Sequence, residues 1–282
     1  MKRIDPHTHS TVSDGTQTPA ELMESAAQAG LDIIGLTDHD TTAGWDEAAH
    51  AVASTGVKLL RGMEVTCRHH DTSVHLLSYL HDPADDTLVA ICARTMESRA
   101  TRAQKMVENL SADYPITWEQ VQQYAPKDGP IGRPHIADAL VAVGAFTNRN
   151  ECFIRALHPS GPYYVPHWSP DPVEATRVIR AAGGVPVIAH PRARGRNNRV
   201  LELEIIEAMI DAGLAGIECD HRDHSVEDSD AMKHLAQTYN LIVTGSSDYH
   251  GTGKPNRLGE NLTDPHEFAR IVEQGKLEVI RP

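Results

Sequence analysis

Short runs rich in Ile, Val and Leu alternate along the chain with longer segments whose apolar residues recur at helical spacing. Such runs are typical of buried strands, and their alternation with helices is typical of βαβ units. Besides a strand in the opening segment, we expect strands at 32–38, 57–65, 74–80, 185–190, 214–219, 241–248 and 277–280. This pattern predicts an α/β fold, a barrel of parallel strands ringed by helices.

Two intervening segments carry complete signals for a helix. "TPAELMESAAQAG" (18–30) has threonine at the N-cap position, proline in the first turn and a closing glycine. "DPVEATRVIRAAGG" (171–184) repeats this order with aspartate and proline. Both are therefore predicted to be helices of the outer ring.

About 100 residues separate the strands expected at 74–80 and 185–190, which is more than one crossover needs. Most of this stretch has a helical pattern. We interpret 100–165 as an inserted helical subdomain that binds substrate, with 1–99 and 166–282 forming the barrel. The segment 158–172, rich in proline and aromatic residues, is expected to be the return linker.

The formal charge of −13 argues against binding to duplex DNA, whose protein partners usually present a basic face, but it allows a small anionic substrate. The four cysteines, Cys67, Cys92, Cys152 and Cys219, form no CxxC pair, so neither a zinc ribbon nor disulfides are expected. The sequence has no run of 18 apolar residues and no apolar signal segment. We therefore expect a cytoplasmic protein that does not enter a membrane, and no obligate protein partner is evident.

The opening segment "IDPHTHS" contains the first candidate for chemistry. Alternate residues of a strand point the same way, so His7 and His9 present two imidazoles to one point. Histidines or carboxylates also end or follow the later strands: Asp38, His39, Glu64, His190, Asp248 and His250. In a parallel barrel the carboxyl ends of the strands meet at one mouth, so these side chains are expected to lie close together.

Two further residues reach this mouth by other routes. His75 begins its run, but the short loop "CRHHDTS" allows an antiparallel hairpin that returns His75 to the side of Glu64. Asp14, in "TVSDGT", lies in the loop after His9 and can fold over the mouth.

Taken singly, each of these histidines fits a hydrogen-bonded loop or core residue. Jointly they predict a metal centre, with nine ligands: His7, His9, Asp14, His39, Glu64, His75, His190, Asp248 and His250. Nine ligands exceed the needs of one ion, so we expect two or three divalent ions bridged by Glu64 or another carboxylate. Imidazole and carboxylate ligands without thiolate suit Mn, Fe or Zn, and Mn is the first expectation.

The motifs "HTH", "TDHD", "AHP" and "SDYH" resemble those of the PHP family, named for polymerase and histidinol phosphatase, over nearly the whole chain. The resemblance implies a distorted (β/α)7 barrel with a trinuclear metal site. It assigns the ligands of the three ions as His7, His9, Glu64 and Asp248 for the first, Asp14, His39 and His250 for the second, and Glu64, His75 and His190 for the third.

Two more stretches, "IGRPHIA" (131–137) and "GIECDHRDHS" (216–225), are similar to the branch of that family that acts on nucleotides. This branch comprises nucleoside 3′,5′-bisphosphate phosphatases related to a 5′ to 3′ exoribonuclease. The similarity implies hydrolysis of the 3′-phosphate of a small nucleotide, with short 5′-phosphorylated RNA as an additional substrate.

Paired metals lower the pKa of a bridging water, so our hypothesis for the mechanism is attack of a metal-bridging hydroxide on phosphorus. Asp248 is expected to manage protons, with His221 as a candidate acid or, alternatively, a structural loop histidine. The second phosphate needs its own anchor, and guanidinium groups suit phosphate oxygens. The candidates are Arg133, His135, Arg194 and Lys254, with a salt bridge at a helix terminus as the alternative for Arg133.

Three other functions stay open on the sequence alone. A histidinol phosphate phosphatase would use the same metals and differ in what binds the far end of the substrate. A C–N hydrolase of the amidohydrolase type is less favoured, because no lysine follows a strand at the bridging position. A metal-bearing domain that only binds a polymerase is disfavoured, because all nine ligands are present.

Overall fold

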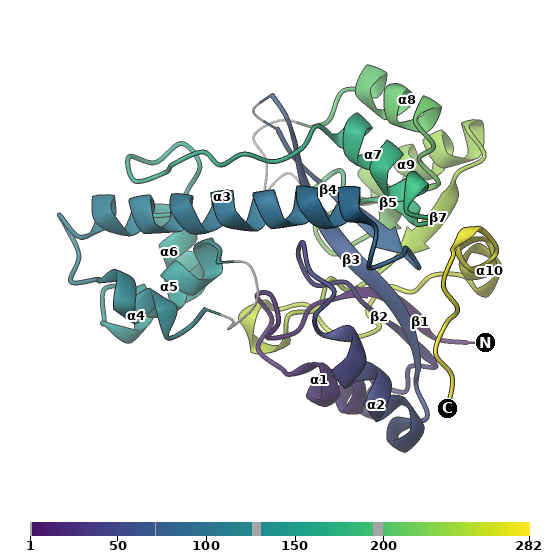
Figure 1. Ribbon diagram of the computed structural model, residues 1–282, viewed down its shortest axis with the longest axis horizontal. Coiled ribbons are helices and arrows are strands. Elements are labelled where there is room, and N and C mark those ends of the chain that lie inside the picture. Colours follow the sequence, from purple (N-terminus) through teal and green to yellow (C-terminus); the bar gives the residue numbers. More distant parts are fainter. Residues whose placement is uncertain (1, 71, 126–130, 194–199) are drawn as a thin grey trace.

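The computed structural model describes residues 2–70, 72–125, 131–193 and 200–282, and its α/β architecture confirms the predicted barrel (Figure 1). Seven strands form one sheet in the order of the sequence. The strands are β1 (Ile4–Thr8), β2 (Ile33–Leu36), β3 (Lys58–His69), β4 (Thr72–Tyr79), β5 (Val185–Ala189), β6 (Gly216–Asp220) and β7 (Ile242–Gly245). A bridge between Thr8 and Tyr249 joins the two ends of the sheet beside the mouth, so the barrel is nearly closed.

All neighbouring strands are parallel except at β4, which is antiparallel to both β3 and β5. The expectation of a wholly parallel barrel is therefore wrong at this strand, whereas the expected hairpin after Glu64 is confirmed. The reason is the short connection between His69 and Thr72, which permits only an antiparallel return.

The strand predicted at 277–280 is wrong. Among the described residues, the only ladder contact of this segment is an isolated antiparallel bridge between Leu59 and Ile280. The apolar side chains of this segment are buried instead at the base of the barrel, where Val279 and Leu277 pack in the same cluster as Leu80 and Ile271. An apolar run of four residues predicts a strand, but here the run is buried because it covers the base of the barrel.

Ten α-helices lie in the described part of the chain. They are α1 (Pro19–Gln28), α2 (Trp45–Thr55), α3 (Asp86–Leu110), α4 (Trp118–Gln122), α5 (Arg133–Ala142), α6 (Arg149–Arg155), α7 (Pro172–Ala181), α8 (Leu203–Asp211), α9 (Val226–Thr238) and α10 (Pro265–Gln274). The two helices expected from their capping signals are confirmed as α1, with a Thr18 and Glu21 capping box, and α7, with Asp171 as N-cap. None of the described helices is long and apolar enough to cross a membrane.

Helix α3 belongs to two hydrophobic cores. Near its start, Leu88 and Cys92 pack in the barrel core with Met63. Near its end, Met106 and Leu110 pack in a separate core with the inserted helices. Figure 1 shows α4, α5 and α6 beyond the barrel, at the far end of α3, and the boundary expected at residue 100 falls inside this helix.

Candidate metal centre

All nine predicted ligands lie at the mouth of the barrel, on strands or on the loops that follow them. One boundary differs from expectation: β3 continues to His69, so Glu64 lies inside the strand rather than at its end. A bridge from His39 to Glu64 still places the loop after β2 against it. His190 and Asp248 adopt positive φ angles of 31° and 51°, a strained backbone that persists only where surrounding contacts fix it.

The buried carboxylate of Glu64 is the centre of the cluster. Its Oε2 atom lies 3.3 Å from Nε2 of His7, 3.0 Å from Nε2 of His9 and 3.2 Å from Nδ1 of His39. Three imidazoles, from β1, the residue just after it and the loop after β2, therefore face one carboxylate oxygen.

The first predicted ligand set meets in space. Ligand atoms of His7, His9, Glu64 and Asp248 lie within 4.8 Å of one another. Oδ1 of Asp248 lies 3.4 Å from Nε2 of both His7 and His9, and these two nitrogens lie 3.1 Å apart. Two nitrogens and two carboxylate oxygens therefore point at one small volume.

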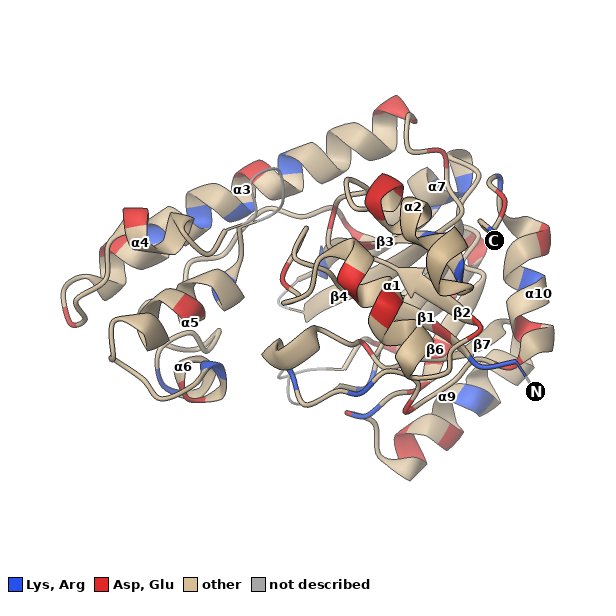
Figure 2. Ribbon diagram, turned by 90° about the horizontal axis from the view of Figure 1, so that it is seen from below, with Lys and Arg blue, Asp and Glu red and all other residues tan. Residues whose placement is uncertain are grey.

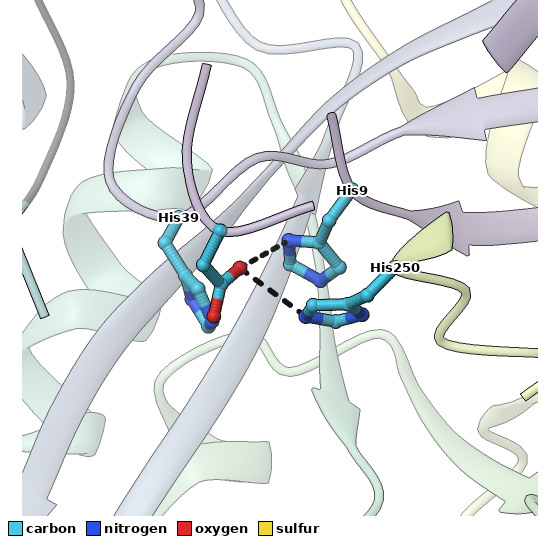
Figure 3. Close-up of side chains that lie close together, drawn as sticks. His9, His39 and His250 are labelled. Atoms are coloured by element: carbon cyan, nitrogen blue, oxygen red, sulfur yellow. Dashed lines mark ion pairs between the residues drawn. The ribbon is translucent and has the colours of Figure 1, made fainter. Parts of the chain in front are cut away.

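The second predicted set also meets, and it includes His9 in addition to the expected residues. Ligand atoms of His9, Asp14, His39 and His250 lie within 4.8 Å of one another. Oδ1 of Asp14 lies 3.2 Å from Nε2 of His250 and 3.8 Å from Nδ1 of His9. Figure 3 shows the rings of His9, His39 and His250 converging from three different segments around a carboxylate.

The third predicted set converges on the other oxygen of Glu64. Nδ1 of His75 lies 2.7 Å and Nε2 of His190 lies 3.0 Å from Oε1. The group whose ligand atoms all lie within 4.8 Å of one another contains His39 with Glu64 and His75. His39 therefore lies between the second and third sets.

The geometry of individual atoms fits bound cations. In the part of the chain that the structure describes, the buried atoms Nδ1 of His39 and Nε2 of His250 have no hydrogen-bond partner, although each lies 3.2 Å from a carboxylate oxygen. Buried polar atoms normally have a partner. Nitrogens and oxygens that face each other without hydrogen bonding are arranged as ligands around a common metal ion, and oxygen and imidazole donors suit a divalent ion.

The charges lead to the same conclusion. Burial alone lowers the pKa of His9, but the carboxylates of Asp248 and Glu64 raise it to about 9. Burial alone raises the pKa of Glu64, but the surrounding imidazoles, His39 first, hold it well below its usual range. Burial lowers the pKa of His250 to about 4, with Lys254 adding to the effect. The carboxylates thus favour positive charge on His9, which a divalent cation would also supply, whereas His250 stays neutral, the form in which an imidazole binds a metal ion.

Two buried carboxylates that the sequence analysis did not assign as ligands lie behind the cluster: Glu218 contacts ligand residues directly, and Asp38 holds Ser10, the residue after His9. Glu218 accepts a hydrogen bond from the backbone N–H of His190 at 2.8 Å and lies 3.1 Å from Nδ1 of His7. Asp38 accepts from the backbone and hydroxyl of Ser10 at 2.8 and 2.7 Å. A second carboxylate on a ligand imidazole fixes its orientation and tautomer. The position of Glu218 in β6, beside the other strand ends, was the available signal.

The two candidates for proton transfer and charge neutralisation lie on the other side of Asp248. Nε2 of His221 is 3.6 Å and Nζ of Lys254 is 3.0 Å from Oδ2 of Asp248. Nδ1 of His221 accepts from the N–H of Asp223 at 3.0 Å, so the proton of a neutral ring is on Nε2. A cavity of about 690 Å³, which we call the main cavity, lies beside the ligands Asp14, His75 and His190. Among the described residues Lys254 lines the main cavity and His221 does not. His221 therefore acts on Asp248 more directly than on anything bound in the cavity.

The remaining phosphate-binding candidates differ in their surroundings. Arg133 lines the main cavity and donates to the carbonyl of Leu157 at 3.0 Å. Its guanidinium carbon lies 5.4 Å from the centre of the Phe153 ring. His135 also lines the cavity, but Nδ1 accepts from the N–H of Gly132 and Nε2 donates to the carbonyl of Ser13 at 2.9 Å. His135 therefore ties the insert to the loop after β1 through both ring nitrogens, and its predicted contact with phosphate stays a prediction. Arg194 lies outside the described residues.

Sequence analysis missed most of a cluster of four arginines that line the same cavity: Arg68, Arg99, Arg102 and Arg133. Of these, Arg99 alone has an ion pair within the described ranges, from Nε to Oδ2 of Asp40 at 3.6 Å. Burial, with Arg133 and Arg99 nearby, lowers the pKa of Arg102 to about 9. This arginine cluster therefore carries excess positive charge in a cavity of about 690 Å³.

A signal for part of the arginine cluster was present in the sequence. Glu64, Thr66 and Arg68 alternate on β3, so they share one face of the strand. Thr66 accepts a hydrogen bond from Arg99, and Arg68 donates to the hydroxyl of Tyr164 at 3.0 Å.

Comparison with known proteins adds three findings. A family model of the PHP domain matches residues 5–133. The chain is 34% identical to a 3′,5′-nucleoside bisphosphate phosphatase from Chromobacterium violaceum, over 100% of this chain and 99% of that protein. A solved structure assigned as a metal-dependent phosphoesterase from Bifidobacterium adolescentis has a TM-score of 0.95 and 43% identity, covering 97% of this chain and 96% of that one.

A second solved structure is that of an amidohydrolase from Chromobacterium violaceum with bound sulfate. It has a TM-score of 0.85 and 32% identity, covering 99% of this chain and 98% of that one.

Proposed function

The chain belongs to the PHP domain family and is a metal-dependent phosphoesterase, and we propose that it hydrolyses the 3′-phosphate of nucleoside 3′,5′-bisphosphates. The observation that carries the proposal is that one cavity is lined both by candidate metal ligands and by the arginine cluster. A substrate with two phosphates satisfies both. The phosphatase from Chromobacterium violaceum, similar along its whole length, supports this choice.

We propose that the nine predicted ligands hold two or three divalent ions, with manganese as the first expectation. Bound divalent ions would supply a hydroxide nucleophile at neutral pH and neutralise the phosphoryl oxygens. The side chains of Glu64 and Asp248 orient the imidazoles around them by the contacts described above. Lys254, held by Asp248 at 3.0 Å, places an ammonium group beside the phosphoryl group.

The leaving 3′-oxygen needs a proton, and Asp248 is the candidate group that manages it, with His221 placed behind Asp248. Nε2 of His221 is directed at Oδ2 of Asp248, 3.6 Å away. In this arrangement His221 controls the position and charge of Asp248, and Asp248 contacts the reacting group. His221 is therefore a positioning residue in the proposal rather than a direct acid.

The arginine cluster binds the 5′-phosphate in this proposal. Buried guanidinium groups bind phosphate through charge-assisted hydrogen bonds, and Nε of Arg68 and Arg102 have no hydrogen-bond partner in the described part of the chain. Histidinol phosphate fits less well, because its far end carries an ammonium group that the arginine cluster would repel.

The test is phosphate release by the Mn²⁺-loaded protein from adenosine 3′,5′-bisphosphate, AMP, histidinol phosphate and a 5′-phosphorylated oligoribonucleotide. We expect preference for the bisphosphate, with AMP as product. Preference for histidinol phosphate would overturn the substrate assignment and keep the metal centre. A parallel assay with a small amide covers the remaining alternative, because hydrolysis of that amide with no phosphate release would favour C–N hydrolysis.

A further inference from the structure

A second cavity of about 310 Å³ lies on the outer side of α3, and we call it the α3 groove. Helix α3 contributes Arg94, Ser98, Thr101 and Lys105 to its lining, and the linker contributes Pro166 and Trp168. The helix residues recur at spacings of three and four, so they form one stripe along α3. The catalytic proposal uses none of these residues.

The charge of the α3 groove is unusual for this protein. Arg94, Arg102 and Lys105 line it, against a single carboxylate, Glu97. The chain as a whole has a net charge of −13. Figure 2 shows several basic positions recurring along α3. A local excess of cations on an acidic protein favours an anionic ligand.

Arg102 connects the groove to the site described above. Arg102 lines both cavities. On α3 it lies between two faces of the helix: the stripe that faces the groove, and the inward face that carries Arg99 and Met106. Arg102 is 6% exposed, and Nη1 lies 3.0 Å from Nδ1 of His167. Anionic groups on opposite sides of Arg102 would therefore share one guanidinium group.

The wall opposite α3 is held in place. The backbone N–H of Trp168 donates to Oγ of Ser98 at 2.7 Å, and the guanidinium carbon of Arg94 lies 3.7 Å from the centre of the Trp168 ring. The stacked pair keeps Arg94 along the groove, so its charge is oriented before a ligand arrives.

We propose that the α3 groove binds a further anionic group attached to the 5′-phosphate, so that 3′-phosphonucleotides with a 5′-diphosphate are preferred substrates. This proposal rests on the proposed function, which places the 5′-phosphate at the arginine cluster. Hydrolysis breaks the bond between phosphorus and the 3′-oxygen. Water supplies oxygen to phosphorus and hydrogen to the 3′-oxygen, giving a nucleoside 5′-diphosphate and inorganic phosphate.

The experiment compares KM for adenosine 3′,5′-bisphosphate and adenosine 3′-phosphate 5′-diphosphate in the wild type, Lys105→Ala and Arg94→Ala. Arg155→Ala is the matched control, because Arg155 is an exposed arginine of the insert that lines neither cavity. We expect the wild type to have a KM about tenfold lower for the 5′-diphosphate, since a charged hydrogen bond near solvent contributes about that factor. Lys105→Ala and Arg94→Ala remove this preference and leave the bisphosphate KM unchanged.

Calorimetric titration of the metal-free protein with both nucleotides gives a second readout that does not depend on turnover. If the wild type releases no phosphate from the bisphosphate, the proposed function fails. The groove proposal is supported separately if the wild type binds the 5′-diphosphate more tightly in the calorimeter and Lys105→Ala abolishes this preference. Equal affinities for the two nucleotides overturn the groove proposal. It is also overturned if Lys105→Ala raises KM only for a 5′-phosphorylated dinucleotide, because the groove would then bind RNA.

Discussion

The two parts of the main cavity are built from opposite kinds of charge. At the metal centre, imidazoles face buried carboxylates, and the hub is Glu64. At the arginine cluster, four guanidinium groups share one described ion pair, between Arg99 and Asp40. The first part is arranged to hold cations that take part in chemistry, and the second to hold an anion that the reaction leaves unchanged. The difference predicts that substitutions in the two parts change different kinetic constants.

The largest effect is expected at Glu64, the carboxylate at the centre of the metal site. Glu64→Gln removes the negative charge that five imidazoles share, so phosphate release should fall on the order of 10³-fold, a loss of several kcal/mol of charge stabilisation. The fall in kcat/KM should be equal for the bisphosphate and for p-nitrophenyl phosphate. The metal content of the variant is measured in parallel by mass spectrometry. Retention of full metal content and activity would show that Glu64 is only a core residue.

A smaller and selective effect is expected at the arginine cluster. Arg99→Ala should raise KM for the bisphosphate by about 10- to 100-fold, because a charged hydrogen bond to phosphate is lost. The kcat/KM for p-nitrophenyl phosphate, which has no second phosphate, should stay within about twofold in steady-state kinetics. An equal loss on both substrates would remove the distinction between the two parts.

The carboxylate behind the ligands should affect metal affinity before it affects substrate. Glu218→Gln weakens the orientation of His7 and His190 and should lower Mn²⁺ affinity by about tenfold, as for other groups that hold metal-binding histidines. Titration with Mn²⁺ followed by calorimetry measures this. The KM for the bisphosphate at saturating Mn²⁺ is the control, and a change in KM alone would contradict the assignment.

The smallest effect tests a residue that links the two parts. Asp40 follows His39 directly, yet its carboxylate accepts from Thr66 at 2.7 and 2.8 Å and pairs with Arg99. Asp40→Asn keeps the hydrogen-bonding shape and weakens the hold on Arg99, so KM for the bisphosphate should rise about threefold, in the range of a weak ion pair. Mn²⁺ affinity should not change in a calorimetric titration, and a loss of Mn²⁺ affinity would place Asp40 with the metal centre.

The convergence of the nine predicted ligands on one place could be predicted from the sequence, because strand order determines it. His9, His39 and Asp248 lie on loops after separate strands, and a barrel brings such loops together whatever the helices do. The arginine end depends on how a hairpin, a long helix and a linker meet. Arg68, Arg99 and Arg102 come from two elements whose packing no local pattern specifies, and only Arg133 was found, from the "GRPH" motif. The strand expected at 277–280 failed similarly, because an apolar run does not reveal what covers it.

The convergence on Glu64 also has a consequence for biosynthesis. His7 and Asp248 are separated by most of the chain, yet both contribute to the same small volume as Glu64. The centre cannot be complete until the ribosome has released the segment after β7. A nascent chain that stops before Asp248 lacks a full set of the proposed ligands, so the proposed centre can form only after the segment that follows β7 has been synthesised.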